Sequence, residues 1–97
     1  MSVYLIAQVE IIDRQQYKQY IKGCLSLPGT IDVVVADESP IVLEGEWPAN
    51  RTVVFRFPTE EDAMRWYRSP EYQAVAQHRV KSARTNLILA KGFTPPT

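Results

Sequence analysis

Hydrophobic and polar residues alternate near the start of the chain. One side of this segment is wholly apolar and consists of Val3, Leu5, Ala7 and Val9. The other side is mixed and consists of Tyr4, Ile6, Gln8 and Glu10. Successive side chains of a β-strand point to opposite faces of the sheet. The pattern therefore predicts a strand from Val3 to Ile12 with one buried face and one partly polar face.

Two segments carry apolar residues at helical spacing. In the first, Asp13 is a predicted N-cap and Pro28-Gly29 ends the helix; its apolar stripe is Tyr17, Tyr20, Ile21, Cys24 and Leu25. The second begins at Thr59, before acidic residues that a helix N-terminus favours. Ser69-Pro70-Glu71 is a further helix-start signal, so we expect a bend there. The stripe beyond it is Tyr72, Val75, Ala76, Val80 and Ala83.

Short β-branched or alternating runs predict four more strands, bounded by turn residues: Ile31–Ala36, Ile41–Trp47, Thr52–Phe57 and Asn86–Lys91. The expected order is β-α-β-β-β-α-β, with the second helix bent. Right-handed crossovers would put both helices on one face of a single sheet. This is a ferredoxin-like α+β arrangement with an extra hairpin strand. Residues 1–92 would form one domain, followed by a Pro-rich tail at 93–97.

The sheet face turned away from the helices would be mixed in character. Its other expected members are Val42, Glu44, Glu46, Thr52, Val54 and Arg56. Such a face is too apolar to lie fully in water and too charged for a closed core. We therefore expect a second copy of the chain to cover it, giving a homodimeric α/β barrel around a semi-polar space. The alternative is a solvated face with scattered exposed aliphatic residues.

Charge and cysteine content narrow the possible partners. Lys+Arg and Asp+Glu both number 11, so the formal net charge is zero, whereas nucleic-acid binding needs a clustered basic surface. We expect neither nucleic acid nor a membrane as a partner. Cys24 is the only cysteine and His78 the only histidine, so no metal and no other cofactor is expected. The single cysteine, with a start unlike a signal peptide, predicts a cytoplasmic protein.

Four segments resemble one known family in their order and spacing. They are Tyr4–Glu10, Leu43–Trp47, Phe55–Pro58 and Trp66–Gln73, and Ser69-Pro70-Glu71-Tyr72-Gln73 is the most specific part. From about Tyr4 to Gly92 the chain is similar to the family named domain of unknown function 1330. The resemblance implies a ferredoxin-like fold and the sheet-to-sheet dimers of the dimeric α/β-barrel superfamily. It implies no particular activity, because that superfamily includes cofactor-free monooxygenases, small-lactone isomerases and haem-dependent enzymes.

Arg79 departs most from its predicted surroundings. At about 100° per residue it falls inside the apolar stripe of the last helical segment, and a buried charge needs a partner. One interpretation is structural: an ion pair with Glu10, Glu44 or Glu46, or an apolar stem whose charge reaches water. The other is a clamp for a substrate carboxylate, which the planar guanidinium suits. The resembling family has arginine at the matching place.

Other polar residues give weaker signals. Glu44 would share a strand face with Glu46. Two such carboxylates can act as a catalytic acid and a base when their environments differ, but on an exposed strand they are more often simply solvated. His78 would lie on a helix flank, which favours a surface role and leaves haem without a suitable axial ligand. Ser69 is expected to cap a helix, since no nucleophile-elbow motif surrounds it. Tyr72 would contribute to an aromatic wall.

The leading hypothesis is a dimeric protein that binds a small molecule. A further step of the same hypothesis is that it is a cofactor-independent enzyme acting on a hydrophobic, oxygenated metabolite. Its candidate ligand-binding residues are Glu44, Arg56, Tyr72 and Arg79, and no catalytic residue is assigned. The alternative is a homo-oligomeric interaction module without a ligand. An open pocket of roughly a few hundred cubic ångströms with unpaired polar groups would favour the first hypothesis. A filled interior would favour the second.

Overall fold

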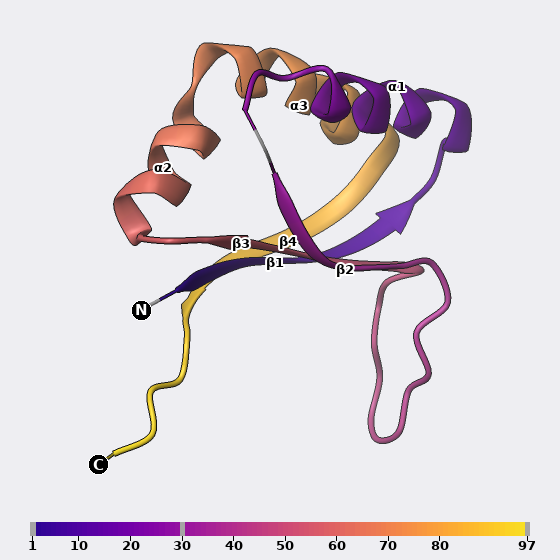
Figure 1. Ribbon diagram of the computed structural model, residues 1–97. Coiled ribbons are helices and arrows are strands. Elements are labelled where there is room, and N and C mark those ends of the chain that lie inside the picture. Colours follow the sequence, from indigo (N-terminus) through magenta and orange to yellow (C-terminus); the bar gives the residue numbers. More distant parts are fainter. Residues whose placement is uncertain (1, 30, 97) are drawn as a thin grey trace.

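The computed structural model describes residues 2–29 and 31–96. A four-stranded antiparallel sheet carries three helices on one face (Figure 1). The elements in chain order are β1 (Val3–Ile11), α1 (Arg14–Leu25), β2 (Asp32–Asp37), β3 (Arg51–Phe57), α2 (Glu60–Arg68), α3 (Pro70–Ser82) and β4 (Ala83–Lys91). The strand order is β2-β3-β1-β4. The predicted α+β fold is therefore confirmed, although Met1 and Thr97, the ends of the predicted domain and tail, lie outside the described residues.

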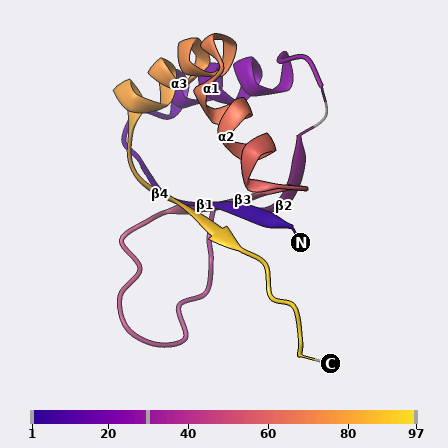
Figure 2. The same ribbon diagram turned by 90° about the vertical axis from the view of Figure 1, so that its left-hand side faces the viewer.

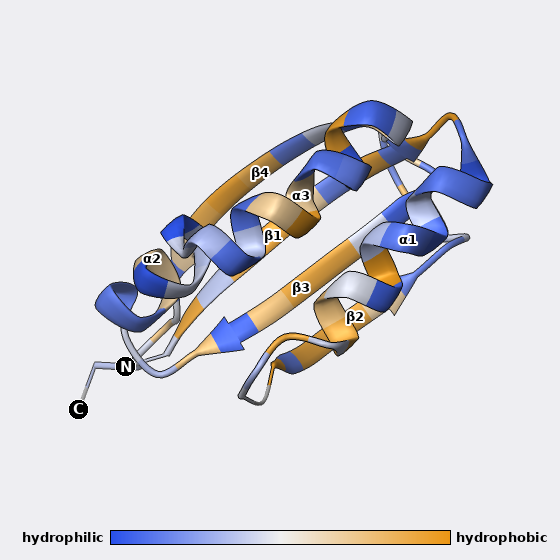
Figure 3. Ribbon diagram, turned by 90° about the horizontal axis from the view of Figure 1, so that it is seen from above, coloured by the Kyte–Doolittle hydropathy of each residue, from blue (hydrophilic) through white to orange (hydrophobic). Residues whose placement is uncertain are grey.

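The central strand β1 organises the interior. Its residues are alternately buried and half-buried from Val3 to Ile11, as the sequence predicts. β1 pairs with β3 on one side and with β4 on the other, so its apolar row continues across three strands. Seen from the helix side, the strands are mainly hydrophobic beneath the helices (Figure 3). The core therefore lies between this sheet face and the helical layer.

Side-chain caps fix where the helices begin. Asp13 Oδ1 accepts a hydrogen bond from the Gln16 amide, and Thr59 Oγ1 accepts one from the Asp62 amide. Ser69 Oγ accepts from the Tyr72 amide at 3.1 Å and donates to the Trp66 carbonyl at 2.8 Å. The three bonds from amides satisfy N–H groups that the helices leave free, and the Ser69 hydroxyl satisfies a carbonyl near the end of α2. The predicted bend is thus a boundary between two helices, and Ser69 is a cap.

The predicted strand at Ile41–Trp47 is wrong. β2 pairs directly with β3, and residues 38–50 form an exposed loop between them. Because β1 and β2 occupy both edges of β3, the loop has no edge of that strand on which to pair. Pro40 also lacks an amide donor, and Gly45 has a φ of 73° that breaks extended structure. The sheet accordingly has four strands instead of five.

The loop and the C-terminal segment extend from the same side of the sheet. Both leave the face opposite the helices, as two perpendicular views show (Figures 1 and 2). Ile41 and Leu43 on the loop are 87% and 89% exposed, and Phe93 after β4 is 85% exposed. Hydrophobic side chains this exposed gain nothing from the fold of a single chain.

Helices α1 and α3 pack together at a glycine. A methyl group at Gly23 would lie 2.6 Å from Val75 Cγ1, closer than two carbon atoms can approach without displacement. Val75 is β-branched and therefore has few alternative rotamers. The absence of a side chain at Gly23 thus sets how closely the two helices approach.

We expect Gly23→Ala to destabilise the protein by about 1–2 kcal/mol in urea unfolding, because overpacking outweighs the gain in helix propensity. In a Val75→Ala background the same change should cost much less, since both γ carbons are gone and only Val75 Cβ, at 3.3 Å, remains close. A stabilising effect of Gly23→Ala in the otherwise unchanged chain would contradict this account of the helix contact.

Candidate functional site

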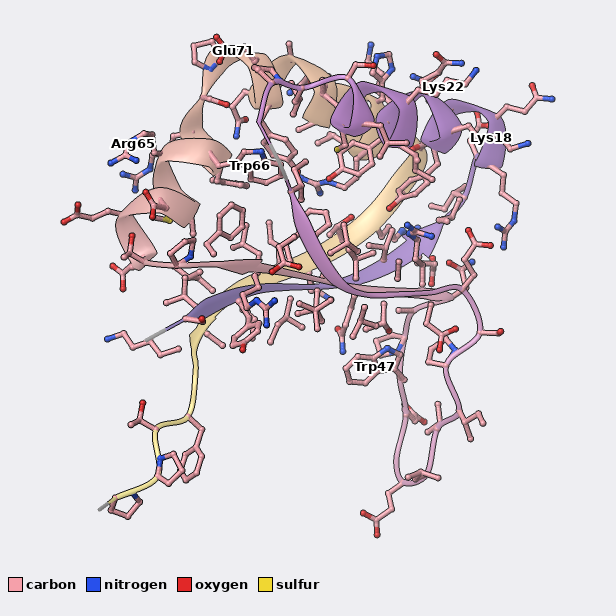
Figure 4. All side chains as sticks on the ribbon, in the orientation of Figure 1. Lys18, Lys22, Trp47, Arg65, Trp66 and Glu71 are labelled. Carbon is pink, nitrogen blue, oxygen red and sulfur yellow. The ribbon has the colours of Figure 1, made fainter. Side chains whose placement is uncertain are left out.

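A cavity of about 380 Å³ lies between the helices and the sheet. This volume is within the range of small-molecule sites. The inner face of the sheet forms its floor, and α1 and α3 form its roof. Trp66 reaches into the same layer from α2 (Figure 4). The lining is mainly apolar.

Small side chains on the floor leave this space open. One cross-strand row of the inner face consists of Ala36, Val53, Ala7 and Leu87. Two of the four are alanines, and the facing part of α1 contributes the small side chain of Cys24. A row of larger residues would reach the helices and close the gap. The cavity therefore follows from residue size along this row.

The cavity opens towards β2. This strand is at the edge of the sheet, and all six of its residues are exposed. Two apolar lining residues at this end are also accessible: Val33 on β2 is 49% exposed and Leu25 at the end of α1 is 80% exposed. Helices cover the inner residues of β1 but leave those of β2 uncovered. A ligand could enter here without disturbing the core.

Three buried tyrosines line the roof: Tyr17, Tyr20 and Tyr72. The hydroxyl oxygens of Tyr20 and Tyr72 are 2.8 Å apart and hydrogen-bonded. The Tyr72 ring also packs on the Trp66 ring, with centroids 4.1 Å apart. Burial raises the pKa of all three hydroxyl groups above the usual tyrosine value. The tyrosines are therefore neutral hydrogen-bonding groups.

Arg79 lies at the cavity without a carboxylate partner. Its guanidinium carbon is 5.6 Å from the centroid of the Tyr20 ring, a cation–π distance. Among residues 2–29 and 31–96 it forms no salt bridge, and Glu10 is instead 3.8 Å from Arg84. Burial alone would lower the pKa of Arg79, but the Tyr72 and Tyr20 side chains outweigh that effect and raise it. The group is therefore charged.

Arg51 is a second cavity arginine, and the sequence reasoning did not single it out. It lies opposite Val9, which in turn lies opposite Thr85, so the three share one row of the inner face. Its guanidinium carbon is 5.6 Å from the centroid of the Tyr17 ring, and Nη1 is 3.2 Å from Glu38 Oε1. Arg51 alternates with Val53, Phe55 and Phe57. Extending the predicted strand by one residue would have placed it on the apolar face.

The structure brings together two of the four predicted site residues. Tyr72 and Arg79 line the cavity. Arg56 lies on the opposite, solvent-facing side of the sheet, where Nη2 is 2.6 Å from Asp32 Oδ2. Glu44 is exposed on the loop of residues 38–50. The acid–base pair of Glu44 and Glu46 therefore has no shared strand face.

Cys24 and His78 are two further residues that the sequence brought into consideration. Cys24 is buried and lines the cavity, and burial raises the pKa of its thiol. His78 is half-buried on α3, with Nδ1 2.7 Å from Gln16 Nε2.

Within the described part of the chain, no group of three or more metal-ligating side chains is assembled. In the same residues, no helix is long and apolar enough to cross a membrane.

The strand order, the helices on one face and the cavity beneath them define a ferredoxin-like α+β domain. Residues 2–93 match the family described as Domain of unknown function (DUF1330), and the chain belongs to this family. The resemblance seen in the sequence is thus confirmed. None of the curated proteins matches the chain.

Solved structures share the fold at low sequence identity. The protein of unknown function RPA0582 from Rhodopseudomonas palustris aligns with a TM-score of 0.70 and 17% identity, over 97% of this chain and 84% of that one. A dimeric protein of unknown function with a ferredoxin-like fold from Bacteroides fragilis gives 0.64 and 13%, over 94% and 96%. An uncharacterised NIPSNAP-like domain protein from Burkholderia xenovorans gives 0.53 and 15%, over 98% and 88%.

The buried tyrosines predict a loss of stability in alkali. Because their pKa values are raised on folding, the native state keeps protons that the unfolded chain releases above about pH 10. This contribution is fully present below that pH and is lost as the pH rises further. We expect a lower urea midpoint at about pH 11 than at about pH 8, with tyrosinate absorbance lagging behind that of the unfolded chain.

Tyr72→Phe supplies the control, because other groups also titrate in alkali. The substitution should lower the free energy of unfolding by about 1 kcal/mol at neutral pH, because Tyr20 loses its hydrogen-bond partner. The variant should nevertheless lose less stability than the unchanged protein between the two pH values. An equal loss in both proteins would contradict a role for Tyr72 in the alkaline transition.

Proposed function

We propose that this protein is a homodimer that binds a small, mainly apolar organic molecule in the cavity between its helices and its sheet. The observation that carries the proposal is an accessible space of about 380 Å³ beside polar groups without partners. Within the described residues, Arg51 Nε, Trp66 Nε1 and Thr85 Oγ1 are buried with no hydrogen-bond partner, and all three side chains belong to the lining. Buried polar groups without hydrogen-bond partners are uncommon in protein interiors.

Ligand binding explains this cavity better than an interaction module does. A module without a ligand needs only a filled core, and close packing would stabilise it. Here the floor carries Ala7 and Ala36, and the mouth at Val33 leads to solvent. A bound molecule would recover the dispersion and hydrophobic energy that the open space forgoes.

The lining supports binding more strongly than catalysis. A general acid or base works best with a pKa near the working pH. Burial instead raises the pKa values of Tyr17, Tyr20, Tyr72 and the Cys24 thiol. We therefore limit the proposal to a binding site, and a cofactor-independent reaction would need a group that the ligand itself supplies.

The opposite face of the sheet supports self-association. Ile88 on β4 and Val35 on β2 are 58% and 37% exposed there, beside half-buried Ile6 and Val54. Trp47 stands on the same side, with its indole N–H donating to Thr52 Oγ1 at 3.0 Å (Figure 4). We propose that a second copy of the chain covers this sheet face, because the Bacteroides fragilis protein of the same fold is described as dimeric.

The loop and the C-terminal segment fit this arrangement. Both extend from the face that a second copy would cover, and they carry the exposed Ile41, Leu43 and Phe93. Such projections could pack against the partner, which would remove their apolar surface from water. The cavity lies on the other side of the sheet, so dimerisation would leave its mouth free.

The ligand proposal is tested by blocking the mouth. A thermal-shift panel of small aromatic and aliphatic alcohols, acids and amides should include compounds that raise the melting temperature, since binding to the native state adds about 2.7 kcal/mol at 100 times Kd. Val33→Trp should abolish these shifts. Val34→Trp should keep them, because Val34 is similarly exposed at 46% but does not line the cavity. A panel without any shift would argue for the interaction module.

The dimer proposal is tested by charging the open sheet face. Ile88→Lys should shift the sedimentation profile from dimer to monomer, because a buried unpaired lysine opposes association. Val80→Lys on α3 should remain dimeric, since Val80 is equally exposed at 60% but belongs to the helical layer. A protein that is monomeric before any substitution would end the proposal.

A further inference from the structure

We propose that the ligand of this cavity is a small organic acid, with its carboxylate beside Arg79 and its apolar part over the floor around Ala7 and Ala36. The inference rests on the proposed function, because it takes the cavity to be the binding site. It adds the chemical class of the ligand, which neither the fold nor the family supplies.

The charges around the cavity are of one sign. Arg51 and Arg79 belong to the lining, which includes no aspartate or glutamate within the described residues. Glu38 pairs with Arg51 from outside the lining; its side chain is 54% exposed and also lies 3.9 Å from Arg14. Arg79 has no such partner among the same residues. In a partly buried setting an uncompensated positive charge attracts an anion more strongly than it would in water.

The polar groups are also rich in donors and poor in acceptors. A guanidinium group donates hydrogen bonds and accepts none. The hydroxyl groups of Tyr20 and Tyr72 share one hydrogen bond, which uses one of their two hydrogens and leaves the other available. Carboxylate oxygens are acceptors that a guanidinium can bind with two parallel hydrogen bonds. An amine or another cation would meet repulsion and few acceptors.

The rest of the cavity selects an apolar body for the acid. Ala7, Ala36, Val53 and Phe55 form the floor beneath the free volume. Inorganic anions or sugars would leave this surface without contacts and would lose their own hydration. A carboxylic acid with a phenyl ring or a short alkyl chain satisfies both regions. Aromatic walls from Tyr20 and Trp66 favour a planar body.

Matched acids and amides test the inference without any substitution in the protein. Phenylacetate is compared with phenylacetamide, and hexanoate with hexanamide, by isothermal titration calorimetry at neutral pH. Each pair differs in charge but hardly in shape. We expect each acid to bind at least about tenfold more tightly than its amide, as a charge-assisted contact would give.

Substitution of one arginine at a time assigns the contact. Arg79→Gln should reduce the preference for acid over amide to less than about threefold, whereas Arg51→Gln should retain most of it because Glu38 already pairs with Arg51. Arg84→Gln is the control for net charge, since its side chain is 81% exposed and not part of the lining. Far-ultraviolet circular dichroism and urea unfolding check that each variant is folded.

The outcomes separate this inference from the proposed function. If amides bind as tightly as acids, the charge inference is overturned while the binding site stands. If Arg79→Gln keeps the preference or Arg51→Gln alone removes it, the assignment to Arg79 is overturned. If neither acids nor amides bind, and the neutral alcohols also fail to shift the melting temperature, the binding site itself is rejected.

Discussion

Burial of the inner row of β1 against the helices holds the sheet and the helical layer together. β1 is paired along both edges, and its inner residues are among the most buried in the chain, with Val9 only 1% exposed. Removing these side chains from water is the main force that brings the helical layer onto the sheet. The position of Ala7 within this row is also what leaves room above the sheet.

The two faces of the sheet give the same residue type different chemistry. Arg56 and Arg79 are both candidate ligand-binding residues in the sequence. Arg56 faces water and forms an ion pair with Asp32, which solvent screens and which contributes little energy. Arg79 lies under the helical layer beside Tyr20 and Tyr72, where no carboxylate compensates its charge. Surroundings that lie far apart in sequence decide which arginine can recognise a ligand.

Local patterns predicted most of the fold and half of the candidate site. The alternation in β1 and the caps at Asp13, Thr59 and Ser69 are short-range features, and each is present in the structure. The segment Ile41–Trp47 has the composition of a strand, but β3 pairs with β2 in its place, so local propensity lost to long-range strand pairing. Arg51 was missed because the predicted strand began at Thr52, one residue too late, which left Arg51 outside the alternating pattern.

Four of the strands, the starts of the helices, the family and the anomaly at Arg79 can all be read from the sequence, because periodicity, capping and spacing are encoded within a few neighbouring residues. The meeting of Arg79 and Arg51 at one cavity, with Glu44 and Arg56 elsewhere, follows from the three-dimensional packing. The reason is physical: a cavity is the volume left between elements, and it depends on side-chain sizes in rows that cross several strands. No single stretch of the chain contains that information.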